Sequence, residues 1–267
     1  MTMQNETIWI TGASSGIGKG LALALAKRGA RLVLSGRNRA ALDEVAADCP
    51  GAHVEAFEAT DLAALPAIVD RVQAATGGVT WLVNNAGISQ RSLALDTDFS
   101  VYRTIMEVDF FAPVRLTQLV LPAMVAAGGG RIINNASVAG KVGSPLRTGY
   151  CSAKHALVGY SDALRAETTQ YGIRVHVLTP GFVATGIGAN ALRGDGSVKG
   201  AGDDPVDAGI SIHEAAEQII AGVLADVPEI PVGRAGAAEM ALLDLKRQDP
   251  ARCFDLMASM APQVPRA

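Results

Sequence analysis

Short apolar segments alternate with longer segments of helical hydrophobic spacing along most of the chain. The apolar run Thr7–Thr11 leads into an Ala/Leu-rich stretch that ends at Gly29, and a second apolar run covers residues 31–35. Apolar runs of this length predict buried strands, and the stretch between them is long enough for a helical crossover between parallel strands. The beginning of the chain therefore predicts two neighbouring parallel strands.

The same alternation continues toward the C-terminus. It predicts further strands over residues 53–58, from Thr80, and over 131–135, 174–178 and 230–233, and further helices over 39–47, 62–76, 99–127 and 150–171. Short apolar strands separated by helices are typical of a doubly wound α/β fold of the Rossmann type, a parallel sheet with helices on both faces. Because no repeat, low-complexity tract or linker divides the sequence, we expect a single domain over residues 1–267.

Two segments depart from this alternation. Residues 186–209 are rich in Gly and Asp and show no periodicity, which is typical of a mobile loop or lid on the substrate side. Residues 235–260 are moderately apolar, and we expect them to pack on the protein or on a second subunit rather than on a membrane.

Composition limits the classes of partner. The chain has 267 residues, 49% of them hydrophobic, and a formal net charge of −3, which does not favour nucleic-acid binding. Its three cysteines lie far apart, and no His, Asp or Glu spacing is typical of a metal site. The N-terminus lacks signal-peptide features, and we find no apolar run near the ~18–20 residues of a membrane span. We therefore expect a cytoplasmic protein with a small-molecule substrate, and no metal, nucleic acid or membrane span.

A glycine-rich turn lies where the first predicted strand meets the first predicted helix. In the segment TGASSGIG, Gly12 permits a tight turn, Gly16 lets the backbone approach a pyrophosphate, and Gly18 allows close packing of the helix. The helix N-terminus adds free N–H groups and positive potential. This context predicts a dinucleotide site rather than a purely structural turn.

The end of the second predicted strand bears on which dinucleotide binds. An acidic residue there would hydrogen-bond the ribose hydroxyls of NAD(H), whereas this chain has Gly36 and then Arg37, whose guanidinium can hold a 2′-phosphate. Ser15 occupies a turn position where a second basic residue would have strengthened this preference. We expect NADP(H) to be preferred, with NAD(H) as the alternative.

A serine, a tyrosine and a lysine follow in an order that suits proton transfer. Ser137 follows the strand predicted over 131–135, and Tyr150 and Lys154 are four residues apart, on one face of the next predicted helix. An ammonium near a phenol favours the phenolate and lowers the tyrosine pKa from ~10 toward neutrality, where acid–base catalysis is efficient. Ser137 can hydrogen-bond the oxygen on which charge develops. A Tyr-x-x-x-Lys pair alone also occurs on solvated helices, so the other motifs give it weight.

Taken together, the motifs resemble those of the short-chain dehydrogenase/reductase family. They are TGASSGIG, Asp61-Leu62, the NNAG of residues 84–87, Ser137, the Tyr150/Lys154 pair and the PGFVAT of residues 180–185, in this order. The tail is also similar to the dehydrogenase/reductase member 7 branch, without that branch's membrane anchor. The resemblance implies hydride transfer between the nicotinamide and an alcohol or carbonyl carbon, with Tyr150 exchanging the proton on oxygen.

The resemblance also implies which residues hold the cofactor. Ser14 and Ile17 would contact ribose and phosphates, and Lys154, beside Tyr150, would hold the nicotinamide ribose. The other implied contacts are Asp61 and Leu62 at the adenine, Asn85, Ala86 and Gly87 at the adenosine ribose, and Pro180, Gly181, Val183 and Thr185 at the carboxamide.

One position departs from the family's pattern. The family usually has an asparagine in the helix that begins near Phe99, and this chain has Asp109 there. The implied role is a backbone carbonyl that holds a water linking the lysine to solvent, and a backbone group survives a change of side chain. We therefore expect the relay to persist and Asp109→Asn to alter activity only modestly.

The substrate is not encoded in a motif. The loop over 186–209 and residues 142–146 carry few charges, which favours a neutral, fairly apolar alcohol or carbonyl compound. Arg147 is in position to meet an acidic substrate, although a solvated loop arginine is the commoner case. The rival function is a catalytically silent dinucleotide-binding redox sensor, which would need no acid–base residue. The apolar faces of the helices over 102–127 and 150–171, which the family commonly pairs between subunits, predict a homodimer or homotetramer.

Overall fold

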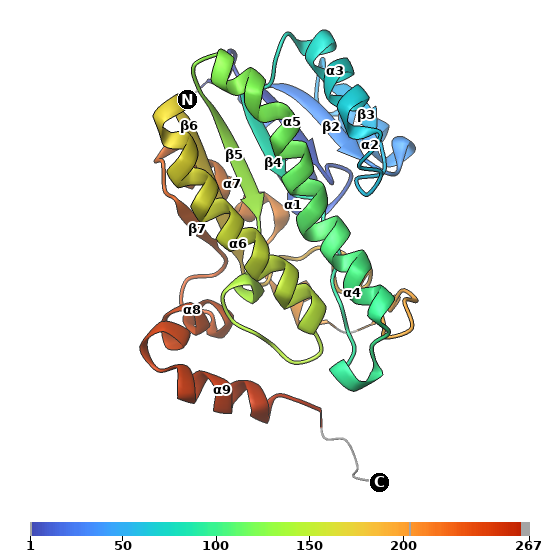
Figure 1. Ribbon diagram of the computed structural model, residues 1–267, viewed down its shortest axis with the longest axis vertical. Coiled ribbons are helices and arrows are strands. Elements are labelled where there is room, and N and C mark those ends of the chain that lie inside the picture. The colour runs from blue at the N-terminus through green and yellow to red at the C-terminus, as the bar shows by residue number, and fades with distance from the viewer. Residues whose placement is uncertain (1, 203, 263–267) are drawn as a thin grey trace.

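A parallel β-sheet forms the centre of the protein, for which the computed structural model describes residues 2–202 and 204–262 (Figure 1). Within these residues seven strands pair in parallel in the order β3-β2-β1-β4-β5-β6-β7. The strands are β1 (Thr7–Thr11), β2 (Arg31–Gly36), β3 (His53–Ala56), β4 (Trp81–Asn84), β5 (Gly130–Asn135), β6 (Ile173–Pro180) and β7 (Glu229–Val232). The strand order reverses between β1 and β4, and in such sheets ligands bind at the carboxyl ends of the strands near this point.

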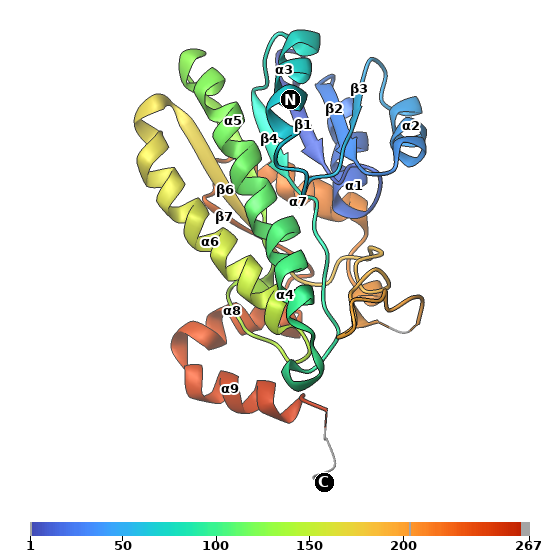
Figure 2. The same cartoon turned by 45° about the vertical axis from the view of Figure 1, so that its right-hand side comes forward.

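Helices cover both faces of the sheet, as Figures 1 and 2 show. One face carries α1 (Gly16–Ala26), α2 (Arg39–Ala47) and α7 (Ile212–Leu224), and the other carries α3 (Leu65–Thr76), α4 (Phe99–Met106), α5 (Ala112–Ala126) and α6 (Thr148–Thr168). Two further helices, α8 (Ala238–Gln248) and α9 (Pro250–Ser259), lie below the carboxyl ends of the strands. This arrangement confirms the doubly wound α/β fold that the hydrophobic pattern predicted.

The central strands β1 and β4 bury both of their faces. In β1, Ile8 and Ile10 pack into the core with α1, α2 and α7, whereas Trp9, which points the other way, packs with α3, α5 and α6. All three side chains are fully buried. Successive side chains of a strand point to opposite faces, so a sheet covered on both sides needs continuous apolar runs of this kind.

The helix predicted over residues 99–127 is interrupted. A π-turn, Glu107–Phe111, separates α4 from α5, and Pro113 follows it at the start of α5. A π-turn adds one residue to a helical turn and changes the direction of the side chains beyond it, and such turns are frequent at functional sites. This interruption turns Asp109 toward the interior, where it is completely buried.

One helix of the core was not predicted from the sequence. The capping box at the start of α7 is formed by Ser211 and Glu214, each of which bonds the backbone N–H of the other. Apolar residues at helical spacing follow, namely Ala215, Ala216, Ile219, Ile220 and Val223. The sequence therefore contains a helix start signal and a helical apolar pattern directly after the aperiodic loop.

The segment Phe99–Ala126 passes a membrane-span test by length and composition alone. A helix that packs in the core of a protein meets the same two criteria. In this fold Leu116, Val120 and Met124 of α5 pack against the sheet.

The loop predicted over residues 186–209 folds back on the protein. Leu192 forms a bridge with Gln90 and another with Val198, and Pro205–Ala208 forms a 3₁₀ turn. Residue 203 of this loop, like residues 1 and 263–267 of the predicted domain, lies outside the described residues. The loop thereby reaches the residues at the carboxyl ends of the strands.

Candidate active site

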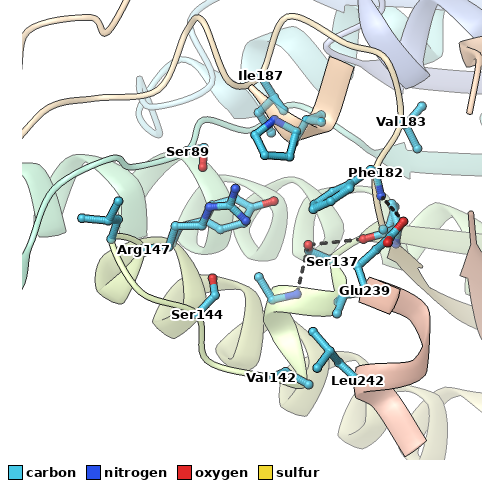
Figure 3. Close-up of a pocket in the computed structure, with 18 of the residues that line it drawn as sticks. Ser89, Ser137, Val142, Ser144, Arg147, Phe182, Val183, Ile187, Glu239 and Leu242 are labelled. Atoms are coloured by element: carbon cyan, nitrogen blue, oxygen red, sulfur yellow. Dashed lines mark hydrogen bonds between the residues drawn. The ribbon is translucent and has the colours of Figure 1, made fainter. Parts of the chain in front are cut away.

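A pocket of about 540 Å³ lies at the carboxyl ends of β5 and β6. Ser137 and Tyr150 line it, together with the segment after β6, the loop over residues 186–209 and the helices α8 and α9. Figure 3 shows Ser137 facing this space, with Phe182 beside it and Val142 and Leu242 below. Segments far apart in the sequence therefore meet around the predicted acid–base residues.

Ser137 is held at the end of β5 by the turn that follows it. Its Oγ accepts a hydrogen bond from the Ala139 N–H at 3.1 Å and donates to the Pro180 carbonyl at 3.4 Å (Figure 3). Both bonds join the hydroxyl to the backbone, so its position does not depend on a flexible side chain. A hydroxyl fixed in this way suits the orientation of a substrate oxygen.

Tyr150 and Lys154 project from one face of α6. Both residues are buried, and the Lys154 Nζ lies 5.6 Å from the centroid of the Tyr150 ring. Lys154 Nζ donates to the Asn135 carbonyl at the end of β5, at 2.9 Å. The structure thus brings the predicted serine, tyrosine and lysine together from two neighbouring segments, the end of β5 and the helix α6.

The Asp109 side chain faces Lys154, whereas the sequence predicted a role only for the Asp109 backbone carbonyl. Its Oδ2 lies 3.3 Å from Lys154 Nζ, and its Oδ1 accepts from the Ile88 N–H at 2.8 Å. A Cβ at Gly87 would lie 3.3 Å from both Asp109 Oδ1 and Lys154 Nζ, so the glycine leaves room for the pair. Asp109 and Lys154 therefore form a buried ion pair directly behind the tyrosine.

The two members of this pair respond differently to burial. Burial raises the pKa of Asp109, and the lysine charge and the Ile88 N–H only partly oppose this. Burial by itself lowers the pKa of Lys154, but the electrostatic interactions with Asp109 and Tyr150 and the hydrogen bond to Asp109 outweigh it, so the pKa is raised. Lys154 consequently stays charged at neutral pH.

The glycine-rich turn has the shape that a bound pyrophosphate needs. Gly12 and Gly16 have φ values of +65° and +53°, which side chains disfavour, and a Cβ at Gly18 would lie 2.3 Å from the Gly12 carbonyl oxygen. Ser15 precedes α1 but does not cap it with its side chain, so the first N–H groups of the helix are left for a ligand. The turn fits a dinucleotide.

The Asn85 side chain takes part in holding this turn. Its Nδ2 donates to the carbonyls of Thr11 and Gly12 at 2.9 and 3.2 Å, and the Thr11 hydroxyl accepts from the Asn85 and Ala86 N–H groups. The Asn85 amide nitrogen therefore already hydrogen-bonds the protein backbone, and in a cofactor site it would position the glycine-rich turn. Gly87, two residues later in the chain, lies next to the Lys154 ammonium.

The remaining predicted cofactor residues lie on two sides of the glycine-rich turn, at the pocket and at the end of β2. Ile17, Pro180, Gly181, Val183 and Thr185 line the pocket. A Cβ at Gly16 would lie 3.2 Å from the Thr185 methyl group, so the segment after β6 reaches the glycine turn. Ser14 lies near Gly36 at the end of β2, since a Cβ there would lie 3.8 Å from the serine Oγ.

Arg37 lies at the end of β2, as the motif requires, and points toward solvent. Its side chain is 75% exposed, and one guanidinium nitrogen is 3.7 Å from a carboxylate oxygen of Glu58. Asp61 is exposed and accepts from the Ala64 N–H before α3, while Leu62 is half-buried. Arg37 is thus accessible to a phosphate, which would compete with Glu58 for it.

Arg147 was expected in solvent, and this expectation was wrong. Its side chain is half-buried and lines the pocket. Arg147 is the last residue before α6, and the loop that ends there also lines the pocket. Burial lowers its pKa, and the neighbouring charge of Arg91 lowers it further.

Several other pocket residues were not predicted from the sequence. Arg91 follows the NNAG segment and pairs with Asp204, and the tail contributes Glu239, Leu242 and Met257. The apolar spacing of the tail indicated packing, but not against which surface. Among the described residues, no group of three or more His, Cys, Asp or Glu side chains is arranged to hold a metal ion.

Comparisons with known proteins show the family and agree with the fold. A family model described as short chain dehydrogenase matches residues 6–195. Dehydrogenase/reductase SDR family member 7B of Danio rerio is 36% identical over 269 aligned residues, covering 97% of this chain and 86% of that protein. A short-chain dehydrogenase structure from Streptomyces avermitilis is 26% identical with a TM-score of 0.77, covering 96% of each chain. Another, from Burkholderia cenocepacia J2315 in complex with NADP, has a TM-score of 0.80 at 24% identity over 96% of this chain and 99% of that one, and supports the fold.

Proposed function

The chain belongs to the short-chain dehydrogenase family, as its motifs indicated, and we propose that it is an NADP(H)-preferring oxidoreductase that interconverts an alcohol and a ketone or aldehyde. Membership of the family makes it an oxidoreductase that acts with NAD(P). The cofactor preference, the role of the tyrosine and the substrate class are our proposal.

The observation that carries the chemistry is the position of the Ser137 and Tyr150 hydroxyls on one pocket, with a charged lysine behind the tyrosine. In the direction of reduction, Tyr150 gives its proton to the carbonyl oxygen as the carbon accepts a hydride. In the direction of oxidation, it takes the hydroxyl proton. The Ser137 hydroxyl proton, which points to the Pro180 carbonyl across a long 3.4 Å contact, turns to donate to that oxygen, and the Lys154 ammonium stabilises negative charge on the phenol oxygen. A bound NADP(H) supplies or accepts the hydride.

Support for NADP(H) comes from the end of β2. Gly36 leaves no acidic side chain to repel a 2′-phosphate, and the exposed Arg37 offers a guanidinium to bind it. The ion pair with Glu58 is exposed and long, so a phosphate of higher charge is expected to displace it.

The test is a titration of the purified protein with NADPH and NADH. We expect NADPH to bind at least about tenfold more tightly, since a charge-assisted contact of this kind contributes on the order of 1.5–3 kcal/mol. Arg37→Ala should remove the difference by weakening NADPH alone. Arg31→Ala, an exposed arginine at the opposite end of the same strand, is the matched control and should change neither affinity. Equal binding of both cofactors to the native protein would contradict the preference and favour an NAD(H)-dependent dehydrogenase.

The redox sensor is distinguished by turnover. Tyr150→Phe should abolish reduction of a broad carbonyl panel by at least ~10³-fold while leaving cofactor affinity within about twofold, because the ring is kept and only the proton donor is lost. Cofactor binding without turnover of any panel compound by the native protein would favour the sensor.

A further inference from the structure

Charge is distributed unevenly around the pocket beside Tyr150. Among the described residues, the lining carries three charged side chains, Arg91, Arg147 and Glu239, and is otherwise mostly apolar. Glu239 faces the Phe182 N–H at 3.4 Å, and Figure 3 draws these two together, away from Arg147. The side of the pocket formed by the arginines is therefore positive.

Arg91 already has an anionic partner. Its guanidinium donates to both oxygens of Asp204 at 2.9 and 3.1 Å, and Lys199 Nζ lies 3.6 Å from the same carboxylate. Burial raises the pKa of Asp204, but the Val206 N–H, Arg91 and Lys199 together hold it below its ordinary value. One ionised carboxylate is thus shared in direct contact by Arg91 and Lys199, and it acts on Arg147 only from a longer distance.

Arg147 has no such partner within residues 2–202 and 204–262. No carboxylate there lies within 4.0 Å of its guanidinium, and its side chain donates no hydrogen bond. Figure 3 shows this side chain extending into the pocket between Ser89 and Ser144. A half-buried guanidinium without an anion is an unfavourable arrangement that a bound anion would relieve.

We propose that the substrate is an apolar alcohol or carbonyl compound that carries an oxoanion, a carboxylate or a phosphate, and that Arg147 binds this group. The proposal rests on the proposed oxidoreductase function and narrows its substrate class. It differs from the neutral substrate that the sequence favoured, because Arg147 lies in the pocket and not in solvent.

The position of Arg147 also orients the substrate. It precedes Tyr150 by three residues at the start of α6, so the anion is held close to the reacting oxygen. The apolar remainder then extends over Val142, Leu242 and Met257, where α8 and α9 close the pocket. An oxoanion accepts two parallel hydrogen bonds from a guanidinium, which fixes this orientation.

The test compares charged and uncharged forms of one substrate. We would measure kcat/KM with NADPH for 2-oxodecanoate, 4-oxodecanoate and their methyl esters. At least one acid should be preferred over its ester by about ten- to hundredfold, and Arg147→Met should bring that ratio close to one. Arg147→Lys should keep part of the preference, and Arg247→Met, an exposed arginine on α8, should keep all of it. An effect of Arg147 on Tyr150 alone would change acid and ester equally and would leave the ratio as it was.

Binding of unreactive probes separates this proposal from the proposed function. Decanoate or decyl phosphate should raise the melting temperature of the native protein with cofactor bound, decanol should do so less, and Arg147→Met should lose the difference. Which of the two anions stabilises more strongly distinguishes a carboxylate from a phosphate substrate. If these shifts occur but no carbonyl compound is reduced, the anion site stands and the oxidoreductase proposal fails. If each ester is reduced with the same kcat/KM as its acid, or if the preference for the acid survives Arg147→Met, the anion site is wrong and the oxidoreductase proposal stands.

Discussion

At the scale of single residues, the buried pair of Asp109 and Lys154 sets the charge behind the tyrosine. Asp109 has no exposed surface and Lys154 is 3% exposed, so water screens neither charge. Besides the carboxylate, the lysine has the Asn135 carbonyl as a hydrogen-bond acceptor. Where the family has a neutral asparagine, this chain therefore has a side chain that gives the charged lysine a buried counter-charge.

Asp109→Asn should reduce stability more than an ordinary polar substitution does. The amide still accepts from the Ile88 N–H, but the Lys154 ammonium loses its counter-charge, and leaving a buried charge unpaired costs on the order of 3 kcal/mol. The raised pKa of Lys154 gives the sign with pH. The stabilisation is fully present below the pKa of an unfolded lysine and is lost as pH rises through the folded-state value, so the difference from the native protein shrinks in alkali.

Urea unfolding of both proteins between neutral and alkaline pH measures this loss. Asp162→Asn removes an exposed carboxylate from α6 and should change the unfolding free energy by less than ~0.5 kcal/mol. An Asp109→Asn protein as stable as the native one would show that the lysine does not depend on the carboxylate. Activity is a separate readout, and the modest change expected for a backbone relay stays a prediction.

At the scale of elements, the close contact of α1 with α7 depends on a glycine. A Cβ added at Gly20 would lie 2.4 Å from the Ile212 carbonyl oxygen, which is backbone and cannot move alone. The N-terminus of α7 is fixed by its capping box, so the two helices meet at a position set by α7. The glycine motif at the start of α1 is therefore held in place from behind by α7.

Gly20→Ala should destabilise the protein by about 1–3 kcal/mol, as overpacking of a tight contact does. Gly159→Ala is the matched control, because Gly159 also lies inside a helix but a Cβ there would meet nothing within 4 Å. That substitution should stabilise by ~0.5–1 kcal/mol, since alanine favours a helix. Thermal unfolding of the two variants should therefore shift in opposite directions, and shifts of the same sign would contradict the packing argument.

At the scale of the whole molecule, one buried histidine links the stability of the sheet to pH. His176 on β6 has no exposed surface, and its Nδ1 lies 2.8 Å from the Val227 carbonyl before β7, so the neutral ring donates there. Burial lowers its pKa, although the Val227 carbonyl and Asp226 oppose this. The folded protein therefore favours the neutral ring between two strands of the sheet.

This shift predicts a loss of global stability in mild acid. With a lowered folded-state pKa, the contribution of His176 is present above the unfolded value of ~6.5 and is lost as pH falls toward the folded-state value, at up to ~1.4 kcal/mol per pH unit. His176→Gln should be less stable at neutral pH but should lose less on acidification. His213 is exposed, and His213→Gln is the control. The unfolding free energies of the native protein and both variants would be measured from pH 7 to 5 and their pH slopes compared. A His176→Gln protein with the native pH slope would assign the acid sensitivity to other groups.

Assembly and location belong to this scale as well. Phe111, within residues 102–127 that are expected to pair between subunits, is 43% exposed, which is compatible with a homodimer or homotetramer. Neither the oligomeric state nor the cytoplasmic location is tested by the fold, and both stay predictions.

The sequence by itself determined the features that depend on interactions between residues close together in the chain. Continuous apolar runs predicted the parallel strands, because a sheet covered on both faces buries both faces of its central strands. The glycine turn and the Tyr150/Lys154 spacing were visible because each depends on residues within one or two turns of the chain. Even α7 was encoded locally, by the Ser211 and Glu214 capping box, although the pattern was overlooked.

Only the tertiary structure decided the rest, because it depends on contacts between distant segments. The π-turn turns Asp109 toward a lysine 45 residues later in the chain, and folding of the loop before α6 places Arg147 in a pocket while Asp204, from another loop, neutralises Arg91. Whether a charge is solvated, paired or left facing a ligand follows from what surrounds it. No spacing along the chain contains that information.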